Sequence, residues 1–180
     1  MNLVLIGYRG TGKTAIGRRL AERLGLRYVG LDAEICNRAG KPIPAIVEES
    51  GWEMFRDLES EVTLAAAGED DCLLDTGGGV ILRGENVKGL RQNAIVFWLT
   101  ATVPEIVQRI GGDDQRPSLT GTRSFTDEVE DVLAERKPKY AAAADHVVDT
   151  SRLSLEEAVT TIADTFTREQ RATAGQKDAS

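Results

Sequence analysis

Short apolar runs alternate along this chain with longer segments in which apolar residues recur every three or four positions. The runs at residues 3–6, 28–31, 72–75, 94–99 and 146–149 predict strands. The run at 94–99 is apolar throughout, as expected of a strand that is covered on both faces. A strand, a helix and a second strand fit within about the first thirty residues, which predicts a βαβ unit and therefore a parallel sheet.

Between these runs, an apolar stripe at helical spacing predicts helices with one buried face. The first helix starts near Lys13, carries Ile16, Leu20 and Leu24 on its stripe, and ends at Gly25. Further helices are predicted at residues 43–47, 55–66, 102–110, 129–136 and 154–166. Capping boxes (a Ser or Thr followed three residues later by Glu) mark the starts at 102 and 154. Pro138 should kink or end the helix that it follows.

A glycine-rich turn follows the first strand directly. Residues 7–14, Gly-Tyr-Arg-Gly-Thr-Gly-Lys-Thr, satisfy the pattern G-x-x-x-x-G-K-S/T, and we call them the phosphate loop. Glycines let successive N–H groups point inward at a phosphate, and the following helix presents its N-terminus to the same anion. Lys13 would contact the β- and γ-phosphates, and the Thr14 hydroxyl would bind Mg²⁺. An ordinary strand–turn–helix is the alternative, but this order of elements favours nucleotide binding.

Acidic residues stand at the ends of two predicted strands. Asp32 and Glu34 follow the second strand, at the edge where open α/β sheets bind ligands. They could hold Mg²⁺ through water and accept a proton from a substrate hydroxyl, or they could merely favour a helix start. The phosphate loop in the same sheet favours the first interpretation. Asp75 ends the third strand, as the Walker-B carboxylate does in P-loop proteins.

Three consecutive glycines follow at 77–79. They suit a ligand that approaches the main chain closely.

Two polar stretches lie outside this pattern. Residues 111–126 have almost no apolar content, so we predict a lid whose Arg116 and Arg123 neutralise phosphoryl charge. From residue 167 to residue 180 the chain is polar again, and we predict a disordered tail after a single domain at 1–166. His146, the only histidine, is expected to have a structural role.

Composition narrows the classes of function. The net charge of −7 argues against a nucleic-acid-binding surface. Cys36 and Cys72 have no partners at metal-ligand spacing, so they fit thiols in a reducing cytoplasm better than a disulfide framework. No apolar run is long enough to span a bilayer, and we therefore expect a cytoplasmic protein that binds neither membrane nor nucleic acid.

These motifs, in this order and spacing, resemble those of the shikimate kinases. The resemblance rests on the phosphate loop, on Asp32 and Glu34, on Phe55-Arg56, on the glycines at 77–79, and on Arg116-Pro117 and Arg136, and it covers about residues 1–166. It implies a three-layer α/β/α fold: a five-stranded parallel sheet of order 2-3-1-4-5 flanked by helices, with a mobile lid. It also implies a P-loop kinase that uses ATP and Mg²⁺.

The resemblance further implies roles for individual residues. For ATP these are Gly10, Thr11, Gly12, Lys13, Thr14, Ala15, Arg109, Arg116 and, with the adenine, Arg152. For the substrate they are Glu34, Arg56, Gly77, Gly78, Gly79 and Arg136. The two arginines would grip the shikimate carboxylate, since planar guanidinium groups suit a carboxylate better than lysines do. Thr14 would bind the metal directly and Asp32 through water. Glu34 is a departure, because the family usually has Asp at the carboxylate that contacts the substrate hydroxyls.

The prediction is therefore phosphorylation of shikimate to shikimate 3-phosphate, on the route to chorismate and the aromatic amino acids. Lys13, Glu34 and Arg116 would be the catalytic residues, and the protein would act as a monomer. Two alternatives stay open at this point. One is a kinase of another small hydroxy acid or polyol, such as gluconate, and the other is a nucleotide-binding regulatory module without catalysis.

Overall fold

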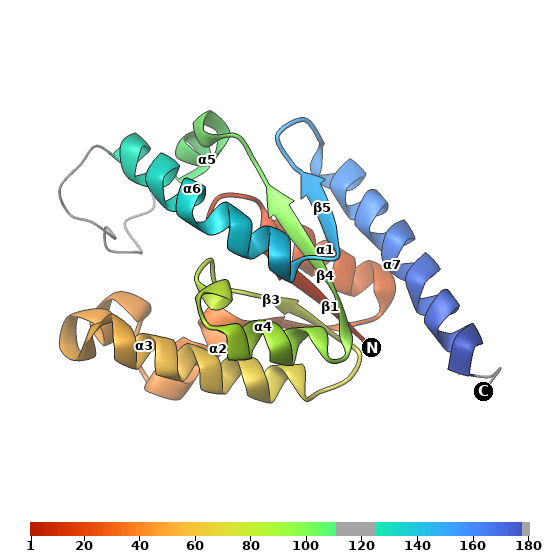
Figure 1. Ribbon diagram of the computed structural model, residues 1–180, viewed down its shortest axis with the longest axis horizontal. Helices are drawn as coiled ribbons and strands as arrows, with labels where there is room; N and C mark the ends of the chain where they lie inside the picture. Colours follow the sequence, from red (N-terminus) through yellow and green to blue (C-terminus); the bar gives the residue numbers. More distant parts are fainter. Residues whose placement is uncertain (111–124, 178–180) are drawn as a thin grey trace.

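The computed structural model describes residues 1–110 and 125–177, and its centre is a parallel sheet of five strands in the order β2-β3-β1-β4-β5 (Figure 1). The strands are β1 (Asn2–Ile6), β2 (Arg27–Gly30), β3 (Cys72–Asp75), β4 (Ala94–Thr100) and β5 (His146–Asp149). Every predicted strand is present, and the predicted strand order is confirmed.

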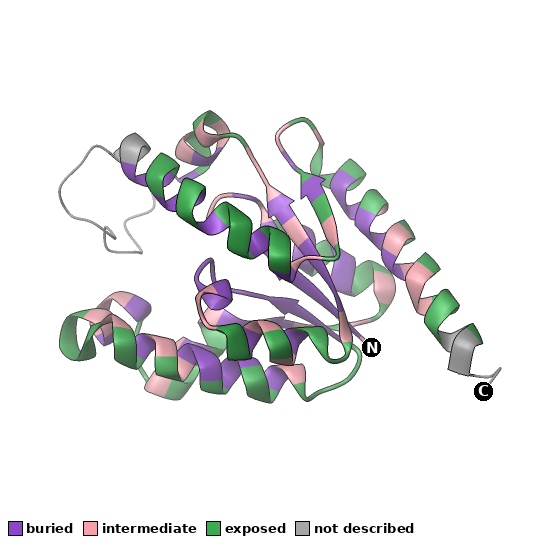
Figure 2. Ribbon diagram, viewed as in Figure 1, coloured by how far each residue is buried: buried purple, intermediate pink, exposed green. Residues whose placement is uncertain are grey.

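Helices cover both faces of the sheet. They are α1 (Lys13–Leu24), α2 (Leu31–Ala39), α3 (Ile43–Ala67), α4 (Gly84–Arg91), α5 (Val103–Ile110), α6 (Phe125–Ala143) and α7 (Leu155–Lys177), with a short 3₁₀ helix, η1, at Val80–Leu82. Side chains alternate along β1: Leu3 and Leu5 pack with α1 and α7, whereas Val4 and Ile6 pack with α2, α3, α4 and α6. In Figure 2 the strands are largely buried, and most helices expose their outer sides.

A third, smaller apolar cluster lies between the phosphate loop and helices α5 and α6. It joins Tyr8 of the loop to Ile106, Ile110, Val129 and Leu133. The loop is thereby packed against the two helices that flank residues 111–124. The predicted lid falls almost wholly on those residues, and they lie outside the described part of the chain.

Four features differ from the sequence prediction or refine it. Helix α7 continues to Lys177, so residues 167–177 are helical where the polar composition predicted disorder. His146 Nε2 lies 2.5 Å from Glu169 Oε1, a tertiary contact beyond Phe166 that composition could not reveal. Helix α6 runs through Pro138 to Ala143, beyond the point where the proline was expected to kink or end it. Helix α4 was not among the helices predicted from the sequence.

Other local predictions hold. Gly51 has a φ of 79° inside α3, so two helical stretches meet at this residue as predicted. The backbone N–H of Glu157 donates to Ser154 Oγ at 3.2 Å, and Glu157 Oε2 accepts from the Ser154 N–H, which completes the predicted capping box. No helix in the described ranges is long and apolar enough to cross a membrane.

Candidate functional site

The phosphate loop has a backbone that only glycine adopts easily. Gly7, Gly10 and Gly12 have φ values of 143°, 79° and 93°. A Cβ atom at Gly7 would lie 2.4 Å from the carbonyl oxygen of Leu99, so a side chain is excluded there by space as well as by conformation. The loop leads directly into α1, whose N-terminal N–H groups face the cavity that Gly12, Lys13, Thr14 and Ala15 line.

Lys13 is buried, with 8% of its surface exposed. Its Nζ donates to the carbonyl oxygens of Gly7 at 2.9 Å and Tyr8 at 3.1 Å. The ammonium group is thus held over the loop at the wall of the same cavity. A cation in this position can reach an anion that the loop binds.

Asp75 also lines this cavity. Its Oδ2 accepts hydrogen bonds from Thr14 Oγ1 and from the Tyr28 hydroxyl, both at 2.7 Å. Burial and the adjacent Asp75 charge raise the pKa of Tyr28, so its phenol keeps its proton. Hydroxyl and carboxylate oxygens are the ligands that Mg²⁺ prefers, and the residues present therefore fit that ion.

Asp32 and Glu34 lie on different sides of α2. Asp32 lines the phosphate cavity with Lys13 and Thr14, whereas Glu34 is exposed and lines a separate groove with Arg27 and Arg38. Two residues along a helix are about 200° apart around its axis, so both cannot face one cavity. This corrects the prediction for Glu34: the structure does not bring it into the site, and Asp32 is the carboxylate that α2 presents there.

Gly77 shows how closely the acidic groups approach the turn after β3. A Cβ atom at Gly77 would come within 2.7 Å of Asp32 Oδ1 and 2.9 Å of Glu59 Oε1. Any side chain at position 77 would therefore displace two carboxylates. This is a steric reason for glycine at the position where the sequence predicts main chain close to a ligand.

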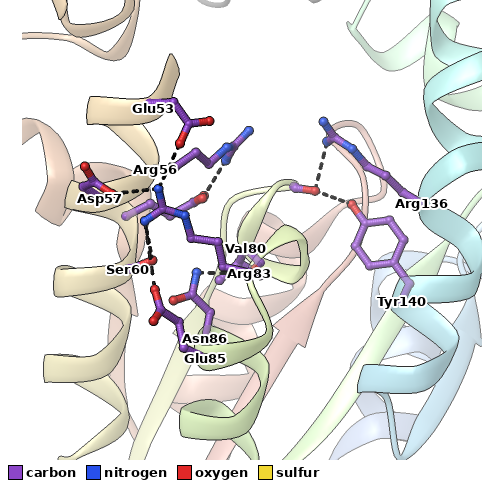
Figure 3. A network of polar contacts seen from close by, with 12 residues as sticks. Glu53, Arg56, Asp57, Ser60, Val80, Arg83, Glu85, Asn86, Arg136 and Tyr140 are labelled. Carbon is purple, nitrogen blue, oxygen red and sulfur yellow. Dashed lines mark hydrogen bonds and ion pairs between the residues drawn. The ribbon is translucent and has the colours of Figure 1, made fainter. Parts of the chain in front are cut away.

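A second pocket adjoins the phosphate cavity, and both are lined by Arg9 and Gly78. Arg56 of α3 and Arg136 of α6 approach it from opposite sides, as Figure 3 shows. Arg136 Nη1 donates to the Gly78 carbonyl at 3.1 Å, and the Tyr140 hydroxyl donates to the same oxygen at 2.5 Å. A Cβ atom at Gly79 would lie 2.1 Å from Arg56 Nη1, so the glycine at 79 lets the Arg56 guanidinium group reach the pocket.

Glu59 is the main residue of this pocket that sequence reasoning missed as a site residue. It is 1% exposed, and its Oε2 lies 2.5 Å from Arg56 Nη1, while no hydrogen bond reaches its Oε1 within the described residues. Burial raises the pKa of Glu59, and the positive charges of Arg56 and Arg136 act in the opposite direction. Its position three residues after Arg56 is typical of a salt-bridge partner on the same helix and does not by itself indicate that it faces a cavity.

The hydroxyl of Tyr8 is a second buried oxygen in this pocket. Its side chain is 2% exposed and lines the pocket, and no hydrogen bond reaches its hydroxyl within the described residues. Buried polar atoms are nearly always hydrogen-bonded in folded proteins. A pocket that combines two guanidinium groups with two such oxygens is therefore suited to a small anion that carries hydroxyl groups.

The remaining predicted arginines are distributed unevenly. Arg109 lines the phosphate cavity, and its guanidinium group donates to the carbonyl oxygens of Gly10 at 3.2 Å and Thr150 at 3.1 Å. Arg152 is exposed after β5. Arg116 and Arg123 lie outside the described residues.

Comparison with known proteins accounts for this combination of sites. A family model described as shikimate kinase matches residues 9–167. The chain belongs to the shikimate kinase family. The shikimate kinase of Nitratidesulfovibrio vulgaris is 44% identical over 147 residues, which are 80% of this chain and 83% of that protein. Shikimate kinase 2 of an Enterobacter species is 43% identical over 153 residues, 83% of this chain and 87% of that one.

Solved structures agree with the family and with its P-loop kinase fold. The shikimate kinase from Acinetobacter baumannii, solved in complex with shikimate, has a TM-score of 0.88 at 32% identity and covers 93% of each chain. A gluconokinase from Sinorhizobium meliloti has a TM-score of 0.57 at 14% identity, a likeness that concerns the fold alone. This member of the shikimate kinase family is therefore an ATP-using kinase.

In this shikimate kinase family member, the described residues contain no set of three or more His, Cys, Asp or Glu side chains that could hold a metal ion. Thr14, Asp75 and Asp32 are oxygen-bearing residues that line the phosphate cavity.

Proposed function

We propose that this protein transfers the γ-phosphoryl group of ATP to a hydroxyl of shikimate and forms shikimate 3-phosphate, on the route to chorismate and the aromatic amino acids. One observation carries the choice of substrate. The pocket with Arg56, Arg136, Glu59 and Tyr8 opens beside the phosphate cavity, and Arg9 and Gly78 line both. A carboxylate held by the two arginines would leave the hydroxyl groups of a small ring for the remaining polar atoms.

The residues of the phosphate loop would bind the nucleotide. Backbone N–H groups of Gly10, Thr11, Gly12, Thr14 and Ala15 are expected to contact its phosphates, and the ammonium group of Lys13 would leave the loop carbonyls for phosphate oxygens. Thr14 and Asp75, with Asp32 through water, would hold Mg²⁺, which neutralises phosphate charge when it is bound. These roles are supported by the position of the residues, with the exception of Thr11, along the lining of one cavity.

Asp32 would take the role that the sequence analysis gave to Glu34. In phosphoryl transfer the substrate oxygen forms a bond to the γ-phosphorus as the bond to ADP breaks, and the hydroxyl proton must leave. The Asp32 carboxylate would accept that proton, and its position beside Gly77 at the cavity supports this role. Glu59 would hold Arg56 in orientation and accept a hydrogen bond from the substrate through its Oε1.

Other parts of the assignment stay predictions. Arg116 in the lid and Arg109 and Arg152 at the adenine are expected from the family resemblance. A single domain at 1–166, a monomeric state and a cytoplasmic location are likewise proposals. The free state of Cys36 and Cys72 in the structure is in keeping with a reducing compartment.

A coupled assay of ADP release tests the reaction. Purified protein is given ATP and magnesium with shikimate, with gluconate or with no acceptor, and the rates are compared. ADP release that depends on shikimate, with shikimate 3-phosphate identified by mass, is the expected result. Turnover of gluconate in preference to shikimate would move the assignment to the other kinase class, and ADP binding without any turnover would support a regulatory module.

A further inference from the structure

Tyr28, Asp75 and Thr14 form a chain of hydrogen bonds along one wall of the phosphate cavity. The Tyr28 hydroxyl and Thr14 Oγ1 both donate to Asp75 Oδ2, each at 2.7 Å. The sequence analysis gave Tyr28 no role, since it stands inside an apolar run and has the character of a strand residue. The structure turns its hydroxyl toward the end of the neighbouring strand.

The register of the sheet explains this contact. Gly30 of β2 lies opposite Asp75 of β3, and Tyr28 lies opposite Leu73, so Tyr28 and Asp75 are diagonal neighbours on adjacent strands. Gly30 has no side chain, and the phenol of Tyr28 passes beside it: a Cβ atom at Gly30 would lie 3.4 Å from the Tyr28 hydroxyl oxygen. The guanidinium group of Arg18 lies 4.9 Å from the centre of the Tyr28 ring and adds a cation–π contact that favours this position.

The two hydrogen bonds set the direction of the Thr14 hydroxyl. A hydroxyl that binds a cation uses a lone pair of its oxygen, and its proton must point elsewhere. Asp75 Oδ2 accepts that proton, which leaves the lone pairs of Thr14 Oγ1 for the cavity. Tyr28 donates to the same carboxylate oxygen and so restrains the acceptor on which the Thr14 orientation depends.

We propose that Tyr28 is a positioning residue for the magnesium–nucleotide site, acting through Asp75 on the hydroxyl of Thr14. This inference rests on the proposed ATP- and Mg²⁺-dependent function. Tyr28 does not touch the nucleotide in this account. It restricts the Asp75 carboxylate to the orientation in which the lone pairs of Thr14 Oγ1 point into the cavity. Loss of the Tyr28 hydroxyl should therefore weaken nucleotide binding only when magnesium is present.

The experiment measures the dissociation constant of ADP by calorimetry, once with saturating magnesium and once in EDTA. The ratio of the dissociation constant in EDTA to that in magnesium reports how much magnesium strengthens ADP binding. In Tyr28→Phe this ratio should fall about fivefold, the change expected for one hydrogen bond of about 1 kcal/mol, while the affinity in EDTA stays the same. In the control Thr161→Val, which removes an exposed hydroxyl bonded to the Glu157 carbonyl on α7, the ratio should not change.

A purely structural role of Tyr28 would weaken ADP binding equally with and without magnesium or leave both values unchanged, and either result overturns the proposal. The double variant Tyr28→Phe/Asp75→Asn gives a second test. Because Tyr28 acts through Asp75, the double variant should lose no more of the ratio than Asp75→Asn alone, and additive losses contradict the mechanism. If Tyr28→Phe does not fold, an unchanged ratio in Asp75→Asn overturns the proposal and a lowered ratio supports it.

The result also separates this inference from the choice of substrate. A wild-type protein that binds ADP in a magnesium-dependent way but does not phosphorylate shikimate would contradict the proposed substrate and leave the role of Tyr28 standing. A wild-type affinity for ADP that does not depend on magnesium would overturn the role of Tyr28 whatever the substrate is.

Discussion

Asp32 and Glu34 are both in the first turn of α2, yet only Asp32 lies at the phosphate cavity. Glu34 lines an exposed groove with Arg27, Asn37 and Arg38 on another side of the helix. The difference follows from the helical repeat, which turns the chain by about 200° over two residues.

A pair of variants tests this relationship. Asp32→Asn should lower kcat for shikimate at least about a hundredfold, since a positioned proton acceptor contributes about that much or more. Glu34→Gln should stay within about twofold of wild type, because an exposed carboxylate away from the pocket has no part in the reaction. Steady-state kinetics with both substrates decide the matter. A large loss in Glu34→Gln with a normal Asp32→Asn would return the role to Glu34.

Arg56→Lys and Arg136→Lys keep the charge but lose the planar fork of donors. Each should raise KM for shikimate by about tenfold or more, in line with the loss of a charge-assisted hydrogen bond, and should leave KM for ATP near its wild-type value. Arg83→Lys is the matched control, since Arg83 pairs with Asp57 at 2.7 Å outside the pocket. An increase in KM for ATP alone would show that the two arginines face the nucleotide.

Tyr8→Phe removes only the buried hydroxyl for which the described structure shows no hydrogen bond. KM for shikimate should rise about fivefold, because the substrate loses one hydrogen bond. The free enzyme should unfold at the same temperature or a higher one, since a buried hydroxyl without a partner has a free-energy cost that the substitution removes. Thermal unfolding without ligand and steady-state kinetics give the two readings. A lower unfolding temperature with unchanged KM would indicate a structural hydroxyl instead.

Glu59 should make the stability of the protein depend on pH. Burial raises its pKa in the folded state above the value in the unfolded chain. A raised pKa contributes stability that is present at low pH and is lost as pH rises through the folded pKa. The free energy of unfolding of wild type minus that of Glu59→Gln should therefore decrease as pH rises through the range above about 4, the ordinary pKa of a Glu side chain. Urea unfolding across this range measures it, and a difference that does not change with pH would contradict the expected shift.

The features that local sequence patterns could predict are those that depend on neighbours along the chain. The phosphate loop is contiguous, so its glycines and Lys13 could be assigned from spacing alone. The five strands are short apolar runs with clear ends, and the capping box at Ser154 needs only four residues. In these cases the residues that make the interaction are also neighbours in the sequence, and the backbone geometry follows from them.

Tertiary contacts decided the rest. Whether Asp32 or Glu34 reaches the cavity depends on the rotation of α2 about its axis relative to β3. The presence of two acidic residues in the sequence does not specify that rotation. Glu59 of α3 and Tyr8 of the phosphate loop are pocket residues only because the fold brings α3, α6 and the loop to one pocket. Helix α7 extends beyond Phe166, where Glu169 meets His146 of β5. The sequence by itself therefore determined the order of elements and the nucleotide loop. The tertiary structure decided which side chains share a cavity, because such contacts join residues that are far apart in the chain.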